Sequence, residues 1–218
     1  MFMNPMLMTE RYEPFNDERY LFEPIVDGHR LQLSFFANKA KLYTRHRNDV
    51  TRQYPELHNV PLREPADVVL DGEVACFNPR TGAIEFDTLI ERYRLNKDAR
   101  IRDARKTFPV TFFVFDILHY NGEDLREKPL MERRKLLGDI LEDNAFYKKL
   151  MFVDGKGEEL FELVKRSGLE GVACKRKDSL YVEGRGGDWQ KVPNAEYASM
   201  KAAAKNRPHP DGLTDYSA

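Results

Sequence analysis

Five carboxylate residues interrupt or border apolar stretches of this sequence, where an unpaired charge would be costly. They are Glu23, Asp71, Glu73, Asp116 and Glu170. A carboxylate in such a setting must be paired, hydrogen-bonded or bound to a cation. One example would suggest a structural ion pair, but the repetition indicates a polar cleft where several strands converge.

Basic residues accompany these carboxylates along the chain, namely Arg30, Arg45, Lys175 and Lys191. Carboxylates and cations in one cleft suit a nucleoside polyphosphate with Mg²⁺, because hard oxygen ligands hold the metal and the cations neutralise phosphate charge. The sequence contains no Walker-type loop and no Rossmann glycine fingerprint, which disfavours both of those nucleotide-binding solutions.

The elements that would position these residues are mostly strands. Residues 20–44 read as a strand, a tight turn at Asp27-Gly28 and a hairpin. Further strands are expected over 68–77, 107–118, 169–177 and 188–193, and helices over 86–96, 130–141 and 158–168. The pattern predicts an α+β domain with antiparallel-rich sheets and flanking helices. Residues 1–195 would form this domain, and residues 196–218 a polar tail too short for a second folded domain.

Composition bounds the remaining possibilities. The 218 residues are 41% hydrophobic and 33% charged, with a net charge of −1, and no apolar run approaches the roughly 20 residues that cross a bilayer. Cys76 and Cys174 lie in apolar contexts, which favours buried free thiols in a reducing cytoplasm. Basic clusters at 45–52, 91–106 and 175–177 are either solvated faces or nucleic-acid contacts. We expect a cytoplasmic monomer.

Six segments, taken in order, resemble the signature motifs of ATP-dependent DNA ligases, a branch of the covalent nucleotidyltransferases. The first motif of that family is KxDGxR, and residues 25–30 read Ile-Val-Asp-Gly-His-Arg. The other segments are YTRHRNDVT (43–51), LDGEV (70–74), FFVFDIL (112–118), EGVACKRKDSLY (170–181) and DWQKVP (188–193). Each segment alone is weak, but their shared order and spacing over residues 5–193 are specific. The resemblance implies an ATP-grasp-like nucleotidyltransferase domain around a nucleotide cleft.

The resemblance also implies a role for each matching position. Ile25, Asp27 and Arg30 take the catalytic positions of the first motif. Glu23 would contact the adenine edge, Phe115 would stack on the adenine ring, and Arg30 and Arg45 would hold the ribose and phosphate of the nucleotide or the nick. Glu73 would bind ribose or help to place the metal, Glu170 would lie beside the Mg²⁺ or Mn²⁺ ion, and Lys175 and Lys191 would contact phosphates. The partners implied are ATP or AMP and nicked double-stranded DNA, whose nicks arise in repair, recombination and replication.

Ile25 departs from the family at the position of the nucleophile. A lysine there would attack the α-phosphate of ATP and carry AMP as a phosphoramidate, whereas isoleucine has no lone pair. Three explanations are open: a lysine-to-isoleucine change made to trap a complex, a natural pseudo-ligase that has lost self-adenylation, or an unrecognised replacement nucleophile. His29 occupies a variable position of the motif and is no obvious substitute.

Other departures bear on activity. Arg47 stands where the family has a small residue, and Pro193 stands where a second lysine is common. The family continues into an oligonucleotide-binding barrel that orients the pyrophosphate, so adenylation by these residues alone would be weak even with lysine restored. Two alternatives remain: a non-catalytic nucleotide- or DNA-binding module, and an RNA ligase or capping enzyme. A capping enzyme would prefer GTP, and an RNA ligase would choose a different nicked strand.

Overall fold

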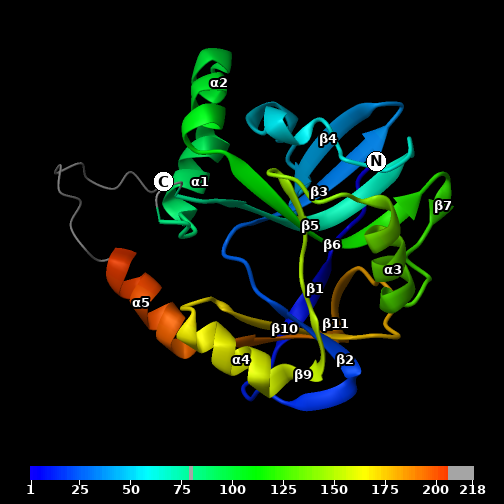
Figure 1. Ribbon diagram of the computed structural model, residues 1–218, viewed down its shortest axis with the longest axis vertical. Helices are drawn as coiled ribbons and strands as arrows, with labels where there is room; N and C mark the ends of the chain where they lie inside the picture. The colour runs from blue at the N-terminus through cyan, green and yellow to red at the C-terminus, as the bar shows by residue number, and fades with distance from the viewer. Residues whose placement is uncertain (79–80, 206–218) are drawn as a thin grey trace.

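Two β-sheets face each other in the computed structural model, which describes residues 1–78 and 81–205 (Figure 1). Within these residues the lower sheet has the strand order β1-β11-β10-β2-β9. Its strands are β1 (Met6–Glu10), β2 (Asn16–Pro24), β9 (Val153–Lys156), β10 (Gly171–Arg176) and β11 (Gly184–Pro193). All pairings in this sheet are antiparallel except that of β1 with β11.

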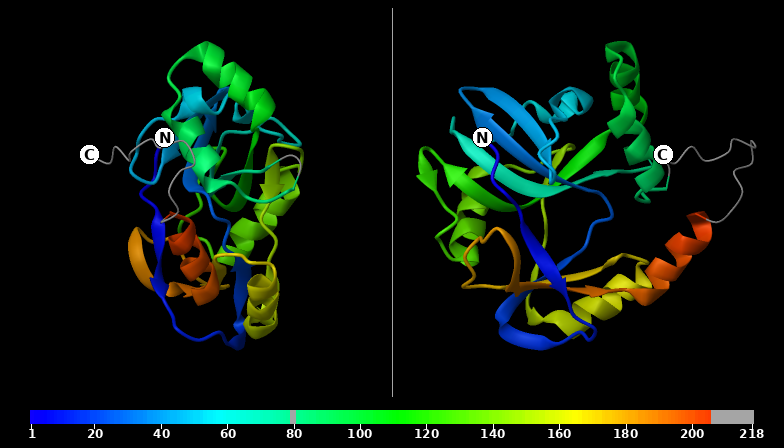
Figure 2. Two further views of the ribbon diagram at one scale, coloured as in Figure 1. Left: turned by 90° about the vertical axis from the view of Figure 1, so that its left-hand side faces the viewer. Right: turned by 180° about the vertical axis from the view of Figure 1, so that it is seen from behind.

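The upper sheet has the strand order β4-β3-β5-β6-β7, with β8 paired to β6 in parallel. Its strands are β3 (His29–Phe36), β4 (Lys39–Thr44), β5 (Val68–Cys76), β6 (Val110–Tyr120), β7 (Glu123–Asp124) and β8 (Tyr147–Lys149). Figure 2 shows the N-terminal segment running from the upper sheet to the lower one. Its upper end is fixed because the backbone of Met3 exchanges two hydrogen bonds with the Gln32 side chain, at 2.7 and 3.0 Å.

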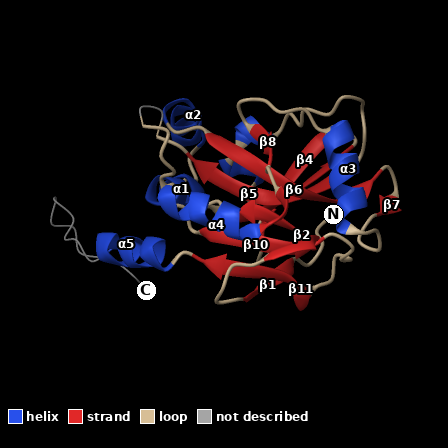
Figure 3. Cartoon of the chain, turned by 60° about the horizontal axis from the view of Figure 1, so that its bottom comes forward, coloured by secondary structure: helices blue, strands red, loops and turns tan. Residues whose placement is uncertain are grey.

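Helices lie around the two sheets, as Figure 3 shows. They are α1 (Phe86–Arg94), α2 (Asp98–Thr107), α3 (Leu130–Ile140), α4 (Gly157–Arg166) and α5 (Ala195–Lys205), with short 3₁₀ turns at Thr51–Gln53 and Pro55–Leu57. The expected α+β class is confirmed, and so are the helices expected over 86–96, 130–141 and 158–168. In the described part of the chain, no helix is long and apolar enough to span a membrane.

The first ten residues of the expected polar tail, 196–205, belong to α5, a helix that was not predicted from the sequence. Alanine and lysine are strong helix formers, and the segment AEYASMKAAAK is rich in both. The helix also has a tertiary anchor, because Tyr197 and Lys201 both contact Asp27. The rest of the expected tail, residues 206–218, lies outside the described residues.

Alternation along the strands separates three groups of buried side chains. In β10, Val172 and Cys174 face α4, where they pack with Leu160 and Val164. Ala173 and Lys175 point the other way and line a pocket between the sheets. The outer side of the upper sheet has its own core, which contains Cys76. Both cysteines are buried free thiols, as expected from their apolar contexts.

The turn that carries the first motif depends on a glycine. Residues 25–28 connect β2 of the lower sheet to β3 of the upper sheet, and the Ile25 amide donates to the Gly171 carbonyl at 2.8 Å. Gly28 passes close to β5, so that a Cβ atom added there would lie 2.2 Å from the carbonyl oxygen of Val74. The absence of a side chain therefore allows the turn to pack directly against the upper sheet.

Replacing Gly28 with alanine should lower the free energy of unfolding by about 1–3 kcal/mol, because the new methyl group overlaps backbone that cannot move alone. Urea denaturation would measure this change. Gly187→Ala is the matched control, since nothing lies within 4 Å of a Cβ atom at that position. Equal stability of the two variants would contradict the close approach.

Candidate functional site

A cleft between the two sheets has a narrow inner pocket and a wider outer part. The inner pocket is lined by Met8, Glu23, Pro24, Ile25, Val26, Arg30, Glu73, Phe115, Leu150, Ala173, Lys175 and Trp189. The outer cleft shares Met8, Ile25, Val26, Arg30 and Glu73 with it and adds, among others, Gly28, Arg45, Phe86, Arg94, Glu170, Arg185 and Lys191. The turn at 25–28 therefore lies where the two parts meet.

The inner pocket combines aromatic rings with a buried ion pair. The ammonium of Lys175 lies 2.6 Å from Glu23 and 3.9 and 4.2 Å from the ring centroids of Phe115 and Trp189. Arg134 of α3 approaches Glu23 at 3.3 Å. Burial lowers the pKa of Lys175, while the neighbouring Glu23 opposes this change. Such a pocket offers rings for stacking and a carboxylate for hydrogen bonds to a base.

The inner pocket is nearly filled by its own side chains. Its volume is ≈ 50 Å³, room for only a few water molecules, against ≈ 820 Å³ for the outer cleft. The guanidinium of Arg30 lies 4.4 Å from the Phe115 centroid, on the same ring that Lys175 contacts. A purine ring would therefore have to displace Arg30 or Lys175 before it could stack on Phe115.

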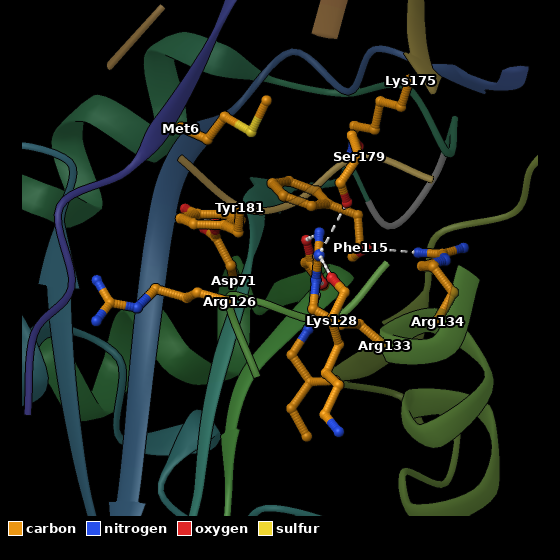
Figure 4. A network of polar contacts seen from close by, with 12 residues as sticks. Met6, Asp71, Phe115, Arg126, Lys128, Arg133, Arg134, Lys175, Ser179 and Tyr181 are labelled. Atoms are coloured by element: carbon orange, nitrogen blue, oxygen red, sulfur yellow. Dashed lines mark hydrogen bonds and ion pairs between the residues drawn. The ribbon is translucent and has the colours of Figure 1, made fainter. Parts of the chain in front are cut away.

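Arg30 is held by a network between the sheets. Its guanidinium makes a two-pronged ion pair with Asp71 of β5, at 2.7 and 2.6 Å. Tyr181 donates its hydroxyl hydrogen to the same carboxylate at 2.5 Å. Figure 4 shows Asp71 and Tyr181 beside Phe115 and the two arginines of α3, Arg133 and Arg134. The network fixes Arg30 at the boundary between the inner pocket and the outer cleft.

The outer cleft is lined by both basic and acidic side chains. Arg30, Arg45, Arg94, Arg185 and Lys191 line it together with Glu10, Glu73 and Glu170. Burial raises the pKa of Glu73 to about 8, against the influence of Arg30, and Glu170, Asp71 and Asp27 raise it further. Burial also raises the pKa of Glu170, with a contribution from Asp27. These carboxyls repel one another, so a cation would stabilise their charged forms.

The carboxylates of the outer cleft suit a metal ion that takes its remaining ligands from water molecules and phosphate oxygens. Among the described residues, no group of three or more His, Cys, Asp and Glu side chains could hold a metal by itself. Mg²⁺ is commonly bound by one or two carboxylates together with water and substrate phosphates. Glu73 and Glu170, which both line the outer cleft, fit that pattern.

Most of the site residues predicted from sequence meet in this cleft. Glu23, Phe115 and Lys175 line the inner pocket, Arg45, Glu170 and Lys191 line the outer cleft, and Ile25, Arg30 and Glu73 line both. Asp27 differs. Its neighbours Val26 and Gly28 line the outer cleft, but its own carboxylate is turned against α5.

The expectation that all five carboxylates share the cleft is wrong for Asp71 and Asp116. Asp71 pairs with Arg30, and Asp116 accepts two hydrogen bonds from Arg133, both at 2.8 Å. The side chains of Asp116 and Arg133 are 0% exposed. The charges of Asp71 and Asp116 are therefore paired with arginines within the protein, and neither residue lines the cleft.

Several residues at the site were not singled out from sequence. Trp189 lies inside the quoted segment DWQKVP, and its indole donates to Ser179 at 3.1 Å. Arg133 and Arg134 lie on the same buried face of α3 as Leu130 and Leu137. Two cations on an otherwise apolar helix face could have indicated from the sequence that buried carboxylates lie opposite them. The contact of Lys201 with Asp27 had no such signal, since 174 residues separate the two.

Comparison with known proteins assigns the family. Residues 5–192 match the family model described as the ATP dependent DNA ligase domain. The chain belongs to the ATP-dependent DNA ligase family. It is 37% identical over 201 residues to the SPbeta prophage-derived DNA ligase-like protein LigB of Bacillus subtilis, covering 92% of this chain and 70% of that protein. DNA ligase 2 of Korarchaeum cryptofilum is 34% identical over 184 residues, which are 80% of this chain.

A solved structure supports the same assignment for this ligase-family domain. The mycobacterial DNA ligase D complexed with ATP and MES superposes with a TM-score of 0.68 at 27% identity, covering 87% of this chain and 60% of that chain. The expected nucleotidyltransferase-type fold is therefore confirmed. The chain spans only 30% of the Korarchaeum ligase, so it corresponds to one part of such longer ligases.

Proposed function

We propose that this chain is the catalytic domain of a ligase that joins nicks in duplex DNA and binds ATP with Mg²⁺ or Mn²⁺ between its two sheets. The observation that carries the proposal is the continuity of the cleft. An aromatic inner pocket with the buried Glu23–Lys175 pair opens into a cleft lined by Arg30, Arg45 and Lys191. A base would enter the first part, and phosphates the second.

The roles follow from this placement. Phe115 would stack on the adenine ring, and Glu23 would accept a hydrogen bond from the exocyclic amine once Lys175 moves aside. Arg30, Arg45 and Lys191 would contact ribose or phosphate oxygens. Lys175, once it has moved away from Glu23, would also contact the phosphates of the nucleotide. Glu73 and Glu170 would hold the divalent cation, which polarises the phosphate under attack and neutralises its charge.

The first step of the ligase reaction lacks its nucleophile in this chain. Ile25 lies at the junction of the inner pocket and the outer cleft, but its side chain cannot form a bond to phosphorus. We therefore expect no covalent AMP at residue 25. The last step, in which the 3′-hydroxyl of a nick displaces AMP from an adenylated 5′-phosphate, needs the cleft and the cation but no lysine. Our proposal includes this step, carried out by a cytoplasmic monomer.

Metal affinity should rise with pH. Because the pKa of Glu73 is about 8, its carboxyl is mostly protonated at pH 7, and a bound cation must displace that proton. Mn²⁺ affinity should increase by up to about tenfold per pH unit between pH 6 and 8 and level off above. Calorimetric titration at several pH values measures this slope, and Glu73→Gln should flatten it. An unchanged slope in that variant would rule out Glu73 as the titrating ligand.

Nucleotide binding tests the proposal directly. Calorimetry of the chain with ATP and Mg²⁺ should show binding, and Phe115→Ala should weaken it by about 1–3 kcal/mol through loss of stacking. Phe108→Ala is the control, because Phe108 is 38% exposed and lies outside the residues that line the cleft. Absence of ATP binding, or equal affinity of the two variants, would contradict the proposed nucleotide site.

Ile25 also favours a second candidate, a pseudo-ligase that binds nucleotide or DNA without catalysis. The basic residues that line the outer cleft would serve such a module equally well. Nicked-duplex binding that weakens steeply with salt, without any sealing of adenylated nicks, would identify it.

A further inference from the structure

Helix α5 brings an amine to the turn that lacks one. Lys201 places its ammonium 2.6 and 2.7 Å from the two carboxylate oxygens of Asp27, two residues beyond Ile25. Tyr197, one turn earlier in α5, donates its hydroxyl hydrogen to the same carboxylate. Figure 1 shows α5 directly after β11, the strand that carries Lys191. The helix lies beyond residues 5–192, which match the family model.

The ammonium of Lys201 lies at the edge of the outer cleft. It is 4.1 Å from the ring centroid of Phe86, which lines that cleft. It also opposes the rise in the pKa of Glu170, which burial and Asp27 cause. The side chain of Lys201 is 32% exposed, and its four-carbon stem can reposition the charge. Lys201 therefore adds positive charge near Glu170, which lines the outer cleft.

We propose that Lys201 supplies to the nucleotide phosphates the positive charge that is missing at position 25. This inference rests on the proposed binding of ATP. The carboxylates of Asp27 and Glu170 would repel a polyphosphate, and an ammonium beside them reduces that repulsion. Lys201 neutralises Asp27 in the free protein and donates to a phosphate oxygen when the nucleotide binds. Its role is non-covalent: it is a phosphate-binding residue and forms no bond to phosphorus.

The test compares ATP affinities, measured by calorimetry with Mg²⁺ present. Lys201→Met should weaken ATP binding about tenfold, because it removes one charge-assisted contact. Lys165→Met is the matched control: Lys165 also pairs with a carboxylate at 2.6 Å, on α4 away from the cleft, and its loss should leave the affinity unchanged. Thermal unfolding establishes that each variant is folded.

A second substitution separates a charge role from a structural one. Ile25→Lys in the Lys201→Met background should restore most of the lost affinity, because it returns an ammonium to the same end of the cleft. A folded Lys201→Met variant that binds ATP as tightly as the unchanged chain would overturn the inference, as would a folded double variant with no recovery. If neither the unchanged chain nor Ile25→Lys binds ATP, the proposed function itself fails, which is a different pattern of results.

Discussion

Replacing Ile25 with lysine should give this chain a covalent AMP adduct, which we do not expect from the unchanged chain. The new amine would enter at the junction of the inner pocket and the outer cleft, where it can attack the α-phosphate of ATP. A nitrogen–phosphorus bond forms, and the bond to pyrophosphate breaks. Incubation with α-labelled ATP and Mg²⁺, followed by denaturation, should leave label on the variant.

The control for this experiment is Ile25→Met, which introduces a long unbranched side chain without an amine. It should remain unlabelled, as should the unchanged chain. Label on either of them would mean that another residue acts as the nucleophile. A folded Ile25→Lys variant that binds ATP and stays unlabelled would show that the cleft does not place the α-phosphate beside residue 25.

Loss of Arg133 should produce the largest change in stability. Arg133→Met leaves Asp116 charged and without its partner at a site where both side chains are 0% exposed. Breaking a buried pair in this way lowers the free energy of unfolding by about 3–5 kcal/mol. The midpoint of urea denaturation should fall accordingly. The double variant Arg133→Met with Asp116→Leu should recover much of the loss, because no buried charge then remains.

The exposed pair of Arg126 with Asp124 offers a matched control. The two side chains approach to 2.6 Å, but they are 41% and 47% exposed. Water and salt screen such pairs, so Arg126→Met should cost about 1 kcal/mol or less. Similar losses in Arg126→Met and Arg133→Met would contradict the view that burial determines the importance of the Arg133–Asp116 pair.

The sequence predicted the cleft residues better than the way they are paired. Glu23, Glu73 and Glu170 stand out as carboxylates beside apolar runs, and the structure brings all three to the cleft. Asp71 and Asp116 give the same signal in the sequence. Their partners Arg30 and Arg133 come from other elements, so only the tertiary fold separates a cleft carboxylate from a buried ion pair.

Helices were predicted where a clear apolar face exists. Helix α2 was not, because Ile101 is its only buried residue and the rest of its sequence reads as a charged loop. Helix α5 was also missed. Its position depends on contacts with Asp27, and no local pattern reports a contact across most of the chain.

Sealing of a nick that already carries 5′-AMP tests the central claim most directly. The unchanged chain would be incubated with this duplex and Mg²⁺ in the absence of ATP, and the joined strand would be separated on a denaturing gel. Because this step needs the cleft and the cation but no lysine, we predict joined DNA and released AMP. A folded chain that binds the adenylated nick and leaves it unjoined would contradict a catalytic role for this cleft.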